Sequence, residues 1–262
     1  MGDKRMLGTI AKDENQVFSD FASFLPLKGA RVVEIGGSLP IDQVLNAGVA
    51  EWHAIDPLNE LWTSCNGRYF SYKTSASSIP LPHDSVDFAF SSNAFEHIAD
   101  LRGTLFELSR VLRPDGILYA HFGPIWSAPD GHHLETVIDG KVFEFWKNSV
   151  VPHWAHLALD EVQLKNLLET MVPEKLARSI SNWVYHSSWL NRWCFEDYLK
   201  AFSEGPLHLV KFEACDEIDY ELPFSQEPYR NLQKIAREKY GRERDIHTRD
   251  ILAVLRKRNL TA

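Results

Sequence analysis

Short apolar runs alternate with helical patterns over the first half of the chain. Five runs rich in apolar and β-branched or aromatic residues, each bounded by turn-forming or polar residues, span 31–35, 52–55, 69–73, 86–90 and 117–122. Runs of this kind are typical of buried strands. Leu101, Leu105 and Leu108 recur at helical spacing behind Asp100, a residue that favours the start of a helix. Strands alternating with helices predict a mostly parallel sheet with helices on both faces.

The pattern changes after residue 122. Most of the tryptophans lie between residues 123 and 193, in a stretch that begins as a Gly- and Pro-containing loop. Helices are expected at residues 13–25, 41–45, 160–171, 173–186, 195–202 and 228–240, and further strands at 207–214 and 251–255. We therefore expect a Rossmann-like α/β fold with a mostly parallel seven-stranded sheet. Its domains would be a core at 1–124, a helical cap inserted after the fifth strand at 125–193, and the completion of the core at 194–262.

Composition narrows the class of protein. The 262 residues are 44% hydrophobic, which is enough for a sizeable core, and carry a net charge of −8, which disfavours DNA or bulk RNA as partner. No apolar run is long enough for a membrane span, and residues 1–12 lack the apolar stretch of a secretory signal. Cys65, Cys194 and Cys215 are too few and too widely spaced for a disulfide framework, which favours the cytoplasm. A basic segment at 230–258 is either a solvated helix face with a basic tail or a contact zone for an acidic acceptor.

Small and polar residues follow the predicted strands. The strand ends carry Gly36-Gly37, Asp56, Ser75-Ala76-Ser77, Ser91-Ser92-Asn93 and the loop 123–133. In an open parallel sheet, ligands bind at the carboxyl ends of the strands. A glycine there lets the backbone approach a ligand, and an acidic residue ending the second strand can accept hydrogen bonds from a ribose diol.

Three stretches resemble a known family. Val32-Val33-Glu34-Ile35-Gly36-Gly37 is similar to the first motif of class I S-adenosylmethionine-dependent methyltransferases. Residues 85–98, which end in Glu96-His97-Ile98, and Ser109-Arg110-Val111-Leu112-Arg113-Pro114-Asp115-Gly116 resemble the "EH … RVLRPGG" pattern of the subgroup related to the ubiquinone and menaquinone methyltransferases. The resemblance covers about residues 30–125 and the closing strands.

The resemblance implies S-adenosylmethionine as cofactor and assigns roles to individual residues. Glu34, Gly36 and Gly37 would line its methionine part, and Asp56 would bind the ribose hydroxyls. Ser75 and Ala76 would flank the adenine, and Ser92 or Asn93 would lie beside the sulfonium. The chain departs from the family at Ser38 and Pro40, where further glycines are usual, and at Ser75, where an aspartate is frequent.

The acceptor is expected to be a small or medium-sized molecule, such as a sugar, a glycan or a secondary metabolite, methylated on oxygen. Histidines near the strand ends favour an oxygen acceptor, because histidine is the usual base near neutral pH. Carboxylate, nitrogen and carbon acceptors remain open. We expect His133, with His132 as the competitor, to take the acceptor's proton. Trp126, Trp146 and Trp154 are either the core of the cap or an aromatic wall for the acceptor. The sequence predicts neither the identity of the acceptor nor the oligomeric state.

Other classes of protein fit less well. The turn at Gly36 lacks the G-x-G-x-x-G spacing of a dinucleotide site, and the chain has neither a P-loop nor a G-x-S-x-G elbow. A metal site built from His121, His132, His133 and Glu135 is an alternative that we do not favour. A catalytically inert binding or scaffold protein that kept the methyltransferase fold is the second reading of the whole chain.

Overall fold

The computed structural model describes residues 13–37, 39–63, 67–216 and 231–258. Ser38 and Cys65 lie outside these described residues. The chain divides into two compact units, the first made of residues 1–123, 199–214 and 250–262 and the second of 124–198 and 215–249.

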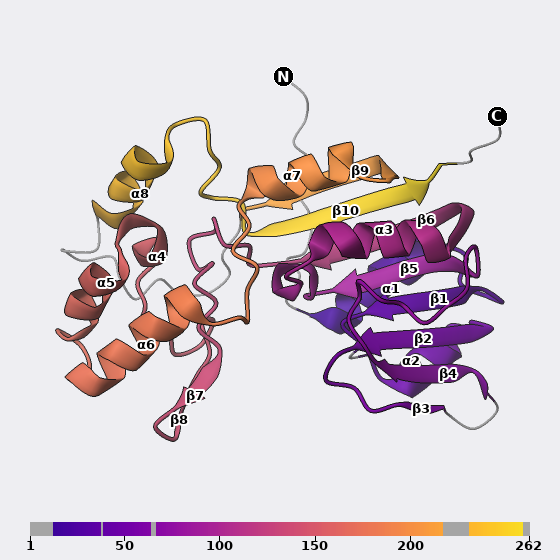
Figure 1. Cartoon of the computed structure of the whole chain (residues 1–262), viewed down its shortest axis with the longest axis horizontal. Coiled ribbons are helices and arrows are strands. Elements are labelled where there is room, and N and C mark those ends of the chain that lie inside the picture. Colours follow the sequence, from indigo (N-terminus) through magenta and orange to yellow (C-terminus); the bar gives the residue numbers. More distant parts are fainter. Residues whose placement is uncertain (1–12, 38, 64–66, 217–230, 259–262) are drawn as a thin grey trace. The chain divides into compact units, whose positions relative to one another are not determined.

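The first unit is built on an eight-stranded sheet with the order β3-β4-β2-β1-β5-β6-β10-β9 (Figure 1). The strands are β1 Arg31–Ile35, β2 Glu51–Asp56, β3 Trp62–Thr63, β4 Tyr69–Lys73, β5 Val86–Ser92, β6 Leu112–Phe122, β9 Leu207–Cys215 and β10 Asp250–Lys257. The pairs β2–β4, β1–β2, β1–β5 and β5–β6 are parallel, and β10 runs antiparallel to β6. This confirms the predicted Rossmann-like, mostly parallel sheet.

The strand count differs by one from the seven expected. The additional strand, β3, has two residues and pairs antiparallel with the outer edge of β4, Trp62 opposite Ser71. A two-residue pairing leaves no periodic pattern in the sequence, so hydrophobic periodicity could not reveal it. β6 also begins earlier than expected, at Leu112, and includes the turn predicted at 114–116. Its register with β5 shifts there, and Asp115 takes a left-handed conformation at φ 63°.

Helices cover both faces of this sheet. They are α1 Glu14–Phe24, α2 Ile41–Asn46, α3 Leu101–Val111 and α7 Phe195–Glu204, with a 3-10 turn, η2, at Phe95–His97. Figure 1 shows α3 in front of the sheet and α1 behind it. Asp13 and Asp100 start α1 and α3 as caps, each accepting a hydrogen bond from a backbone N–H of the first turn.

The two faces of the sheet have separate aromatic cores. On the α1 face, Phe21 packs against Phe90 and Tyr119, with ring centroids 4.8 and 5.6 Å apart. On the opposite face, Phe122 packs against Phe95 and the α7 residue Phe202. Because side chains alternate along a strand, the side chains of residues 90, 92, 119 and 121 all lie on the α1 face of the sheet.

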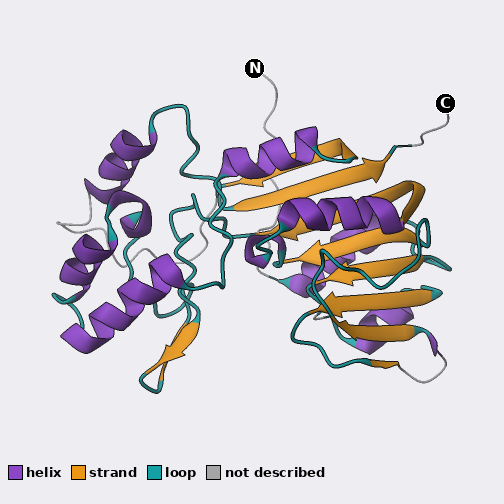
Figure 2. Ribbon diagram, viewed as in Figure 1, coloured by secondary structure: helices purple, strands orange, loops and turns teal. Residues whose placement is uncertain are grey.

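The second unit is mainly helical (Figure 2). It contains α4 Ala155–Ala158, α5 Glu161–Leu168, α6 Glu174–His186, α8 Leu232–Tyr240 and a hairpin formed by β7 Thr136–Ile138 and β8 Lys141–Phe143. It has its own apolar cluster, which includes Leu164, Ile180 and Val184 from α5 and α6. The hairpin and α4 were not predicted, because each is too short to show a clear period.

The boundaries of this unit differ from the predicted domains. Residues 194–262 were expected to complete the core, but residues 215–249 belong with the helical unit. The physical reason is the apolar face of α8, whose Leu232 and Ala236 are buried in the same cluster as Leu164. Only β9, β10 and the end of α7 return to the sheet.

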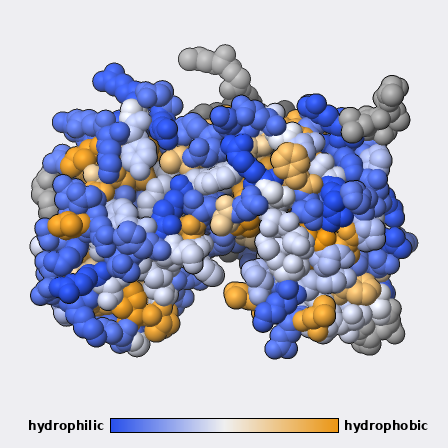
Figure 3. Space-filling view, in the orientation of Figure 1, coloured by the Kyte–Doolittle hydropathy of each residue, from blue (hydrophilic) through white to orange (hydrophobic). Residues whose placement is uncertain are grey.

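The exposed surface is mostly hydrophilic on the face drawn in Figure 3, with small separated apolar areas. Within the described ranges, no helix combines the length and the apolar character needed to cross a membrane.

Candidate functional site

The residues predicted from the strand ends gather at one edge of the first unit. The strands β4, β2, β1, β5 and β6 are neighbours and run parallel, so they all end at that edge. Their last residues are Lys73, Asp56, Ile35, Ser92 and Phe122. This confirms that the sheet brings these segments to a common edge. Parallel sheets bind ligands there, outside the carboxyl ends of the strands.

The turn after β1 requires its two glycines. Gly36 has a φ of 96° and Gly37 a φ of 28°, backbone conformations that other residues rarely adopt. A Cβ on Gly36 would lie 2.7 Å from the Cβ of Ala94, and one on Gly37 would lie 2.9 Å from Nδ2 of Asn59. The glycines are therefore needed by the fold of this edge itself, in addition to any ligand.

Glu34 stabilises the same turn from inside the protein. Its Oε2 accepts a 2.7 Å hydrogen bond from Nε1 of Trp52, and its Oε1 accepts one of 3.2 Å from the backbone N–H of Leu39. The side chain is almost completely buried, 2% exposed. Glu34 thus ties the backbone of Leu39 to the end of β1 and to Trp52 on β2.

Asp56 ends β2 as predicted and shapes the following loop. Its Oδ1 accepts a 2.6 Å hydrogen bond from the backbone N–H of Leu58, while its carbonyl accepts hydrogen bonds from the N–H groups of Asn59 and Thr74. The side chain is only partly buried. One carboxylate oxygen therefore has a local structural partner, and the loops after β2 and β4 are tied together at this residue.

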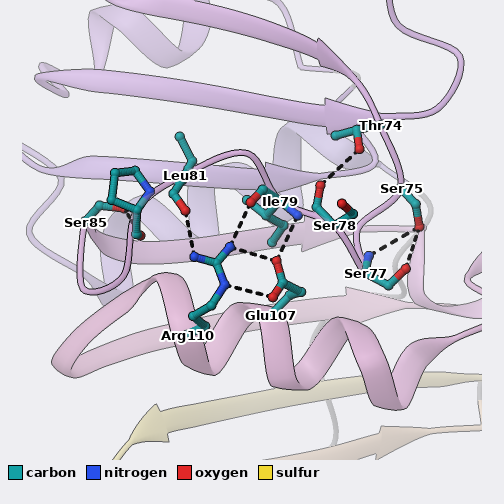
Figure 4. Close-up of polar contacts among 10 residues, drawn as sticks. Thr74, Ser75, Ser77, Ser78, Ile79, Leu81, Ser85, Glu107 and Arg110 are labelled. Carbon is teal, nitrogen blue, oxygen red and sulfur yellow. Dashed lines mark hydrogen bonds and ion pairs between the residues drawn. The ribbon is translucent and has the colours of Figure 1, made fainter.

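The loop after β4 carries Ser75 and Ala76 and is internally hydrogen-bonded (Figure 4). The Oγ atoms of Ser75 and Ser77 lie 3.0 Å apart, and Oγ1 of Thr74 donates to the carbonyl of Ser78 at 3.0 Å. Ser75 is exposed and Ala76 is buried. The loop therefore has a defined shape at the edge of the sheet.

A pair on α3 fixes the continuation of this loop, and sequence reasoning missed its role. Arg110 donates to the carbonyl of Leu81 at 2.7 Å and to that of Ile79 at 2.8 Å (Figure 4). Glu107 accepts from Arg110 and, at 3.0 Å, from the N–H of Ile79. The hydrogen bonds from Arg110 hold the pKa of Glu107 below its usual value. The i,i+3 spacing of the two residues was a signal for the ion pair but gave no indication of the loop that it anchors.

At the end of β5, polar atoms are buried without partners among the described residues. These are Oγ of Ser92 and Oδ1 of Asn93. Asn93 has a left-handed backbone at φ 46°, and its N–H donates to the carbonyl of His121 at 3.1 Å. Non-glycine residues in this conformation are uncommon and gather at functional sites. Buried polar atoms of this kind are where a ligand can supply the missing hydrogen bonds.

The Glu96-His97 pair follows on η2. Glu96 is buried and accepts a 3.2 Å hydrogen bond from the N–H of Gly123, the residue directly after β6. It therefore links the end of β6 to the segment after β5, which is a positioning role within the first unit.

The predicted bases lie in the second unit, on the loop that was expected after β6, and this loop is buried. His132 is fully buried; its Nδ1 accepts from the N–H of Leu134 at 3.1 Å and its Nε2 lies 3.4 Å from Oγ of Ser149. His133 has a φ of 47° and packs on Phe145, with ring centroids 4.4 Å apart. The cofactor residues belong to the first unit, so the two sets of predicted site residues fall in separate compact bodies.

Further buried groups surround these histidines. Nε2 of His156 donates to the carbonyl of Trp126 at 2.8 Å, and burial lowers the pKa of His156 to about 4. The buried pair Asp130–Arg249, 2.9 Å apart, lies in the same unit. Arg249 therefore lies neither on a solvated helix face nor in an exposed contact zone for an acidic acceptor, the two interpretations of the basic segment. Arg230 of that segment lies outside the described residues. No group of three or more potential metal ligands occurs among the residues with described positions.

The three singled-out tryptophans have different environments. Trp126 is buried, with the guanidinium of Arg192 5.5 Å from its ring centroid. Nε1 of Trp154 donates to the carbonyl of Ile246 at 2.8 Å. Trp146 is 41% exposed. Trp126 and Trp154 are thus part of the framework of the second unit, and Trp146 is the one of the three with a free surface.

These features fit S-adenosylmethionine. Four features lie on neighbouring strands at this edge. They are the loop at Ser75 and Ala76 after β4, the carboxylate of Asp56 after β2, the left-handed glycine turn after β1, and, after β5, the atoms of Ser92 and Asn93 that have no partner among the described residues. Such a row can accommodate a positively charged ligand that also carries hydroxyl groups.

Comparisons with known proteins agree with this fit. Residues 33–120 match the family model described as a methyltransferase domain. An uncharacterized methyltransferase of Mycobacteroides abscessus is 28% identical over 143 residues, which cover 50% of this chain and 54% of that protein. The chain thus spans about half the length of the curated relative that it matches.

Solved structures share the fold at low identity. A methyltransferase solved with the Haloferax volcanii Trm112 activator is 19% identical, with a TM-score of 0.52 and coverage of 95% of this chain and 92% of that one. An S-adenosylmethionine-dependent methyltransferase from Mesorhizobium loti is 14% identical, with a TM-score of 0.52 and coverage of 94% and 100%. The [4+2]-cyclase SpnF is 13% identical, with a TM-score of 0.51 and coverage of 97% and 86%.

The matched residues 33–120 include β1, β2, β4, β5 and most of β6, the strands whose ends form the row described above. Residues 33–120 of this chain therefore match a methyltransferase domain, and the chain shares its fold with solved S-adenosylmethionine-dependent methyltransferases.

Proposed function

We propose that this protein transfers the methyl group of S-adenosylmethionine to an oxygen of a small or medium-sized acceptor, such as a sugar, a glycan or a secondary metabolite. The observation that carries the proposal is the row of Gly36, Asp56, Ser75 and Ser92 at the ends of four neighbouring parallel strands. The cofactor supplies an activated methyl group and its leaving group. The protein has to align the acceptor, exclude water and remove a proton.

Each cofactor residue receives a proposed role. The backbone at Gly36 and Gly37, fixed by Glu34, holds the methionine part, and Asp56 accepts hydrogen bonds from the ribose hydroxyls. Ser75 and Ala76 flank the adenine. Ser92 and Asn93 lie beside the sulfonium, where their unpartnered oxygens favour positive charge.

For the proton we propose His133 as base, with His132 as the competitor. Both are on the segment that follows β6, one of the strands of the cofactor edge. Burial and neighbouring histidines lower the pKa of His132 well below its usual value, so its ring is neutral at pH 7 but is a weaker base than an exposed histidine. We assign acceptor specificity to the second unit, whose exposed Trp146 offers an aromatic surface. The buried Cys194 is a free cysteine, which supports a cytoplasmic location.

The direct test is calorimetric titration with S-adenosylmethionine and S-adenosylhomocysteine, followed by transfer of a labelled methyl group to a panel of hydroxyl-bearing acceptors. Binding of both ligands with transfer to an oxygen supports the proposal. Absence of binding at millimolar ligand would contradict it. Binding without transfer to any acceptor would favour the alternative, a methyltransferase-fold binding protein.

A further inference from the structure

His121 on β6 has no role in the proposed function, yet its environment is unusual. The side chain is 1% exposed, and neither ring nitrogen has a hydrogen-bond partner among the described residues. An imidazole carries one donor and one acceptor when neutral, and leaving both unpaired in the interior costs free energy. A buried polar group without partners in a native fold requires an explanation, and a ligand is one.

The neighbouring strand places a second such group beside it. Ser92 on β5 is the parallel partner of His121, so both side chains point to the α1 face of the sheet. Oγ of Ser92, 7% exposed, also has no partner among the described residues. Two unpartnered polar side chains on adjacent strands can share one hydrogen-bonding ligand group.

The order of the strands indicates which ligand this is. Along the sheet, β4, β2, β1 and β5 carry the groups proposed for adenine, ribose, methionine and sulfonium. β6 is the next strand, and His121 is its penultimate residue. A group held between Ser92 and His121 therefore lies one strand beyond the cofactor, on the side where the methyl acceptor has to be.

The ring is suited to a neutral partner. Burial lowers the pKa of His121 to about 4, with Asp20 on α1 raising it and Lys211 on β9 lowering it to smaller extents. The imidazole is therefore uncharged at neutral pH, with one nitrogen that accepts a hydrogen bond. A hydroxyl can donate to that nitrogen and accept from Oγ of Ser92 at the same time.

We propose that His121 and Ser92 form a hydroxyl-binding subsite for the methyl acceptor. The inference rests on the proposed function, to which it adds the contact that orients the acceptor. The hydroxyl in this subsite keeps its proton; the oxygen that is methylated is a different one, and its proton goes to the base proposed above. Acceptors without a hydroxyl in this position should bind weakly, because they would leave both side chains unpaired.

Nuclear magnetic resonance of the full chain labelled at histidine Cε1 tests the subsite, with His121→Gln identifying the resonance. The probes are phenol and anisole, which differ by the methyl group that replaces the hydroxyl proton, each titrated in the presence of S-adenosylhomocysteine. We expect phenol to shift the His121 resonance saturably and anisole to leave it in place. His53 is the internal control, because it is buried on β2 with both ring nitrogens next to Tyr72 and Glu51.

Ser92→Ala should weaken phenol binding by about fivefold, which corresponds to the loss of one hydrogen bond of about 1 kcal/mol. A His121 resonance that stays in place with phenol, or that moves equally with anisole, overturns the subsite. Failure of S-adenosylhomocysteine to bind the unsubstituted protein in the same samples overturns the proposed function instead. The two failures are therefore distinguishable.

Discussion

The side chains of Glu107 and Arg110 on α3 are joined by two hydrogen bonds of 2.8 Å. The remaining hydrogen bonds of this pair go to Ile79 and Leu81, on the loop between β4 and β5. One ion pair therefore connects a helix of the methyltransferase domain to the loop that carries the proposed adenine contacts. The ion pair stabilises the fold mainly through the backbone groups that hydrogen-bond to it, since isolated surface ion pairs contribute little to the free energy of folding.

Arg110→Ala should loosen this loop and weaken cofactor binding. The substitution removes the donors for two carbonyls and the partner of Glu107, which should destabilise the protein by about 2 kcal/mol or more. S-adenosylhomocysteine affinity should fall, and amide hydrogen exchange at residues 74–81 should become faster. Arg113→Ala is the matched control, because Arg113 pairs with Asp87 and donates to no loop carbonyl in the described structure. Equal effects of the two substitutions would contradict the anchoring role.

The parallel sheet could be predicted from the sequence because each of its strands is a buried run with a distinct end. β1 was predicted with its observed bounds, and β2, β5 and β10 to within two residues at each end. The signals for the candidate site were also local: a glycine pair, Asp56 and Ser92 at the ends of apolar runs. Local patterns predict which segment ends at the ligand edge, since the edge is defined by strand direction.

Long-range contacts could not be predicted in this way. The pairing of Arg110 with Leu81 spans 29 residues, and the placement of α8 in the second unit depends on burial of Leu232 beside residues of α5 and α6. The segment that carries His132 and His133 contains Gly and Pro and is a loop as predicted, but its burial was not predicted. Composition indicates the turns of such a segment, whereas its burial depends on what packs around it.

Asp56→Asn should reduce affinity for S-adenosylhomocysteine by about tenfold or more, through loss of charge-assisted hydrogen bonds to the ribose. Asparagine keeps an Oδ1 that can accept from the N–H of Leu58, so the loop and the melting temperature should be preserved. Titration calorimetry and a thermal melt of the same samples check both points. Glu60→Gln, at an exposed carboxylate, is the control; if only that variant lost affinity, Glu60 would be the ribose ligand.

Trp146→Ala should lower methyl transfer while leaving cofactor affinity and melting temperature unchanged, since the indole is 41% exposed. Trp154→Phe should instead destabilise the protein by about 1 kcal/mol, because it removes the donor to the carbonyl of Ile246. Denaturant unfolding and transfer of a labelled methyl group separate the two effects. A Trp146 variant with normal turnover on an identified acceptor would remove this side chain from acceptor recognition.

Acidification should destabilise the protein through its buried neutral histidines. Burial lowers the pKa of His132, His153 and His156, the last to about 4 from a usual value of 6.5. The unfolded chain therefore binds protons that the folded chain does not, so stability falls as the pH drops below about 6.5. Each such histidine contributes a slope of about 1.4 kcal/mol per pH unit until its folded pKa is reached.

Urea unfolding between pH 7 and pH 4 measures this slope. His156→Gln should make it shallower, because the glutamine amide can still donate to the carbonyl of Trp126 but takes up no proton. A slope unaffected by His156→Gln would show that this histidine does not carry the acid sensitivity.

The proposed base makes the most demanding prediction. His133→Ala should lower the rate of methyl transfer by about a hundredfold, the usual contribution of a general base, and leave the affinity for S-adenosylhomocysteine intact. The ring contact with Phe145 is lost as well, so His133→Asn, which keeps a polar side chain of similar reach, should accompany it. The acidic limb of the rate profile against pH should disappear in both variants, which a purely structural role would not produce.

If the limb and the rate stay near normal, the proton is taken elsewhere. The same measurements on His132→Asn then decide whether His132 is the base. Ser149→Ala is the control, because it removes the hydroxyl that faces Nε2 of His132.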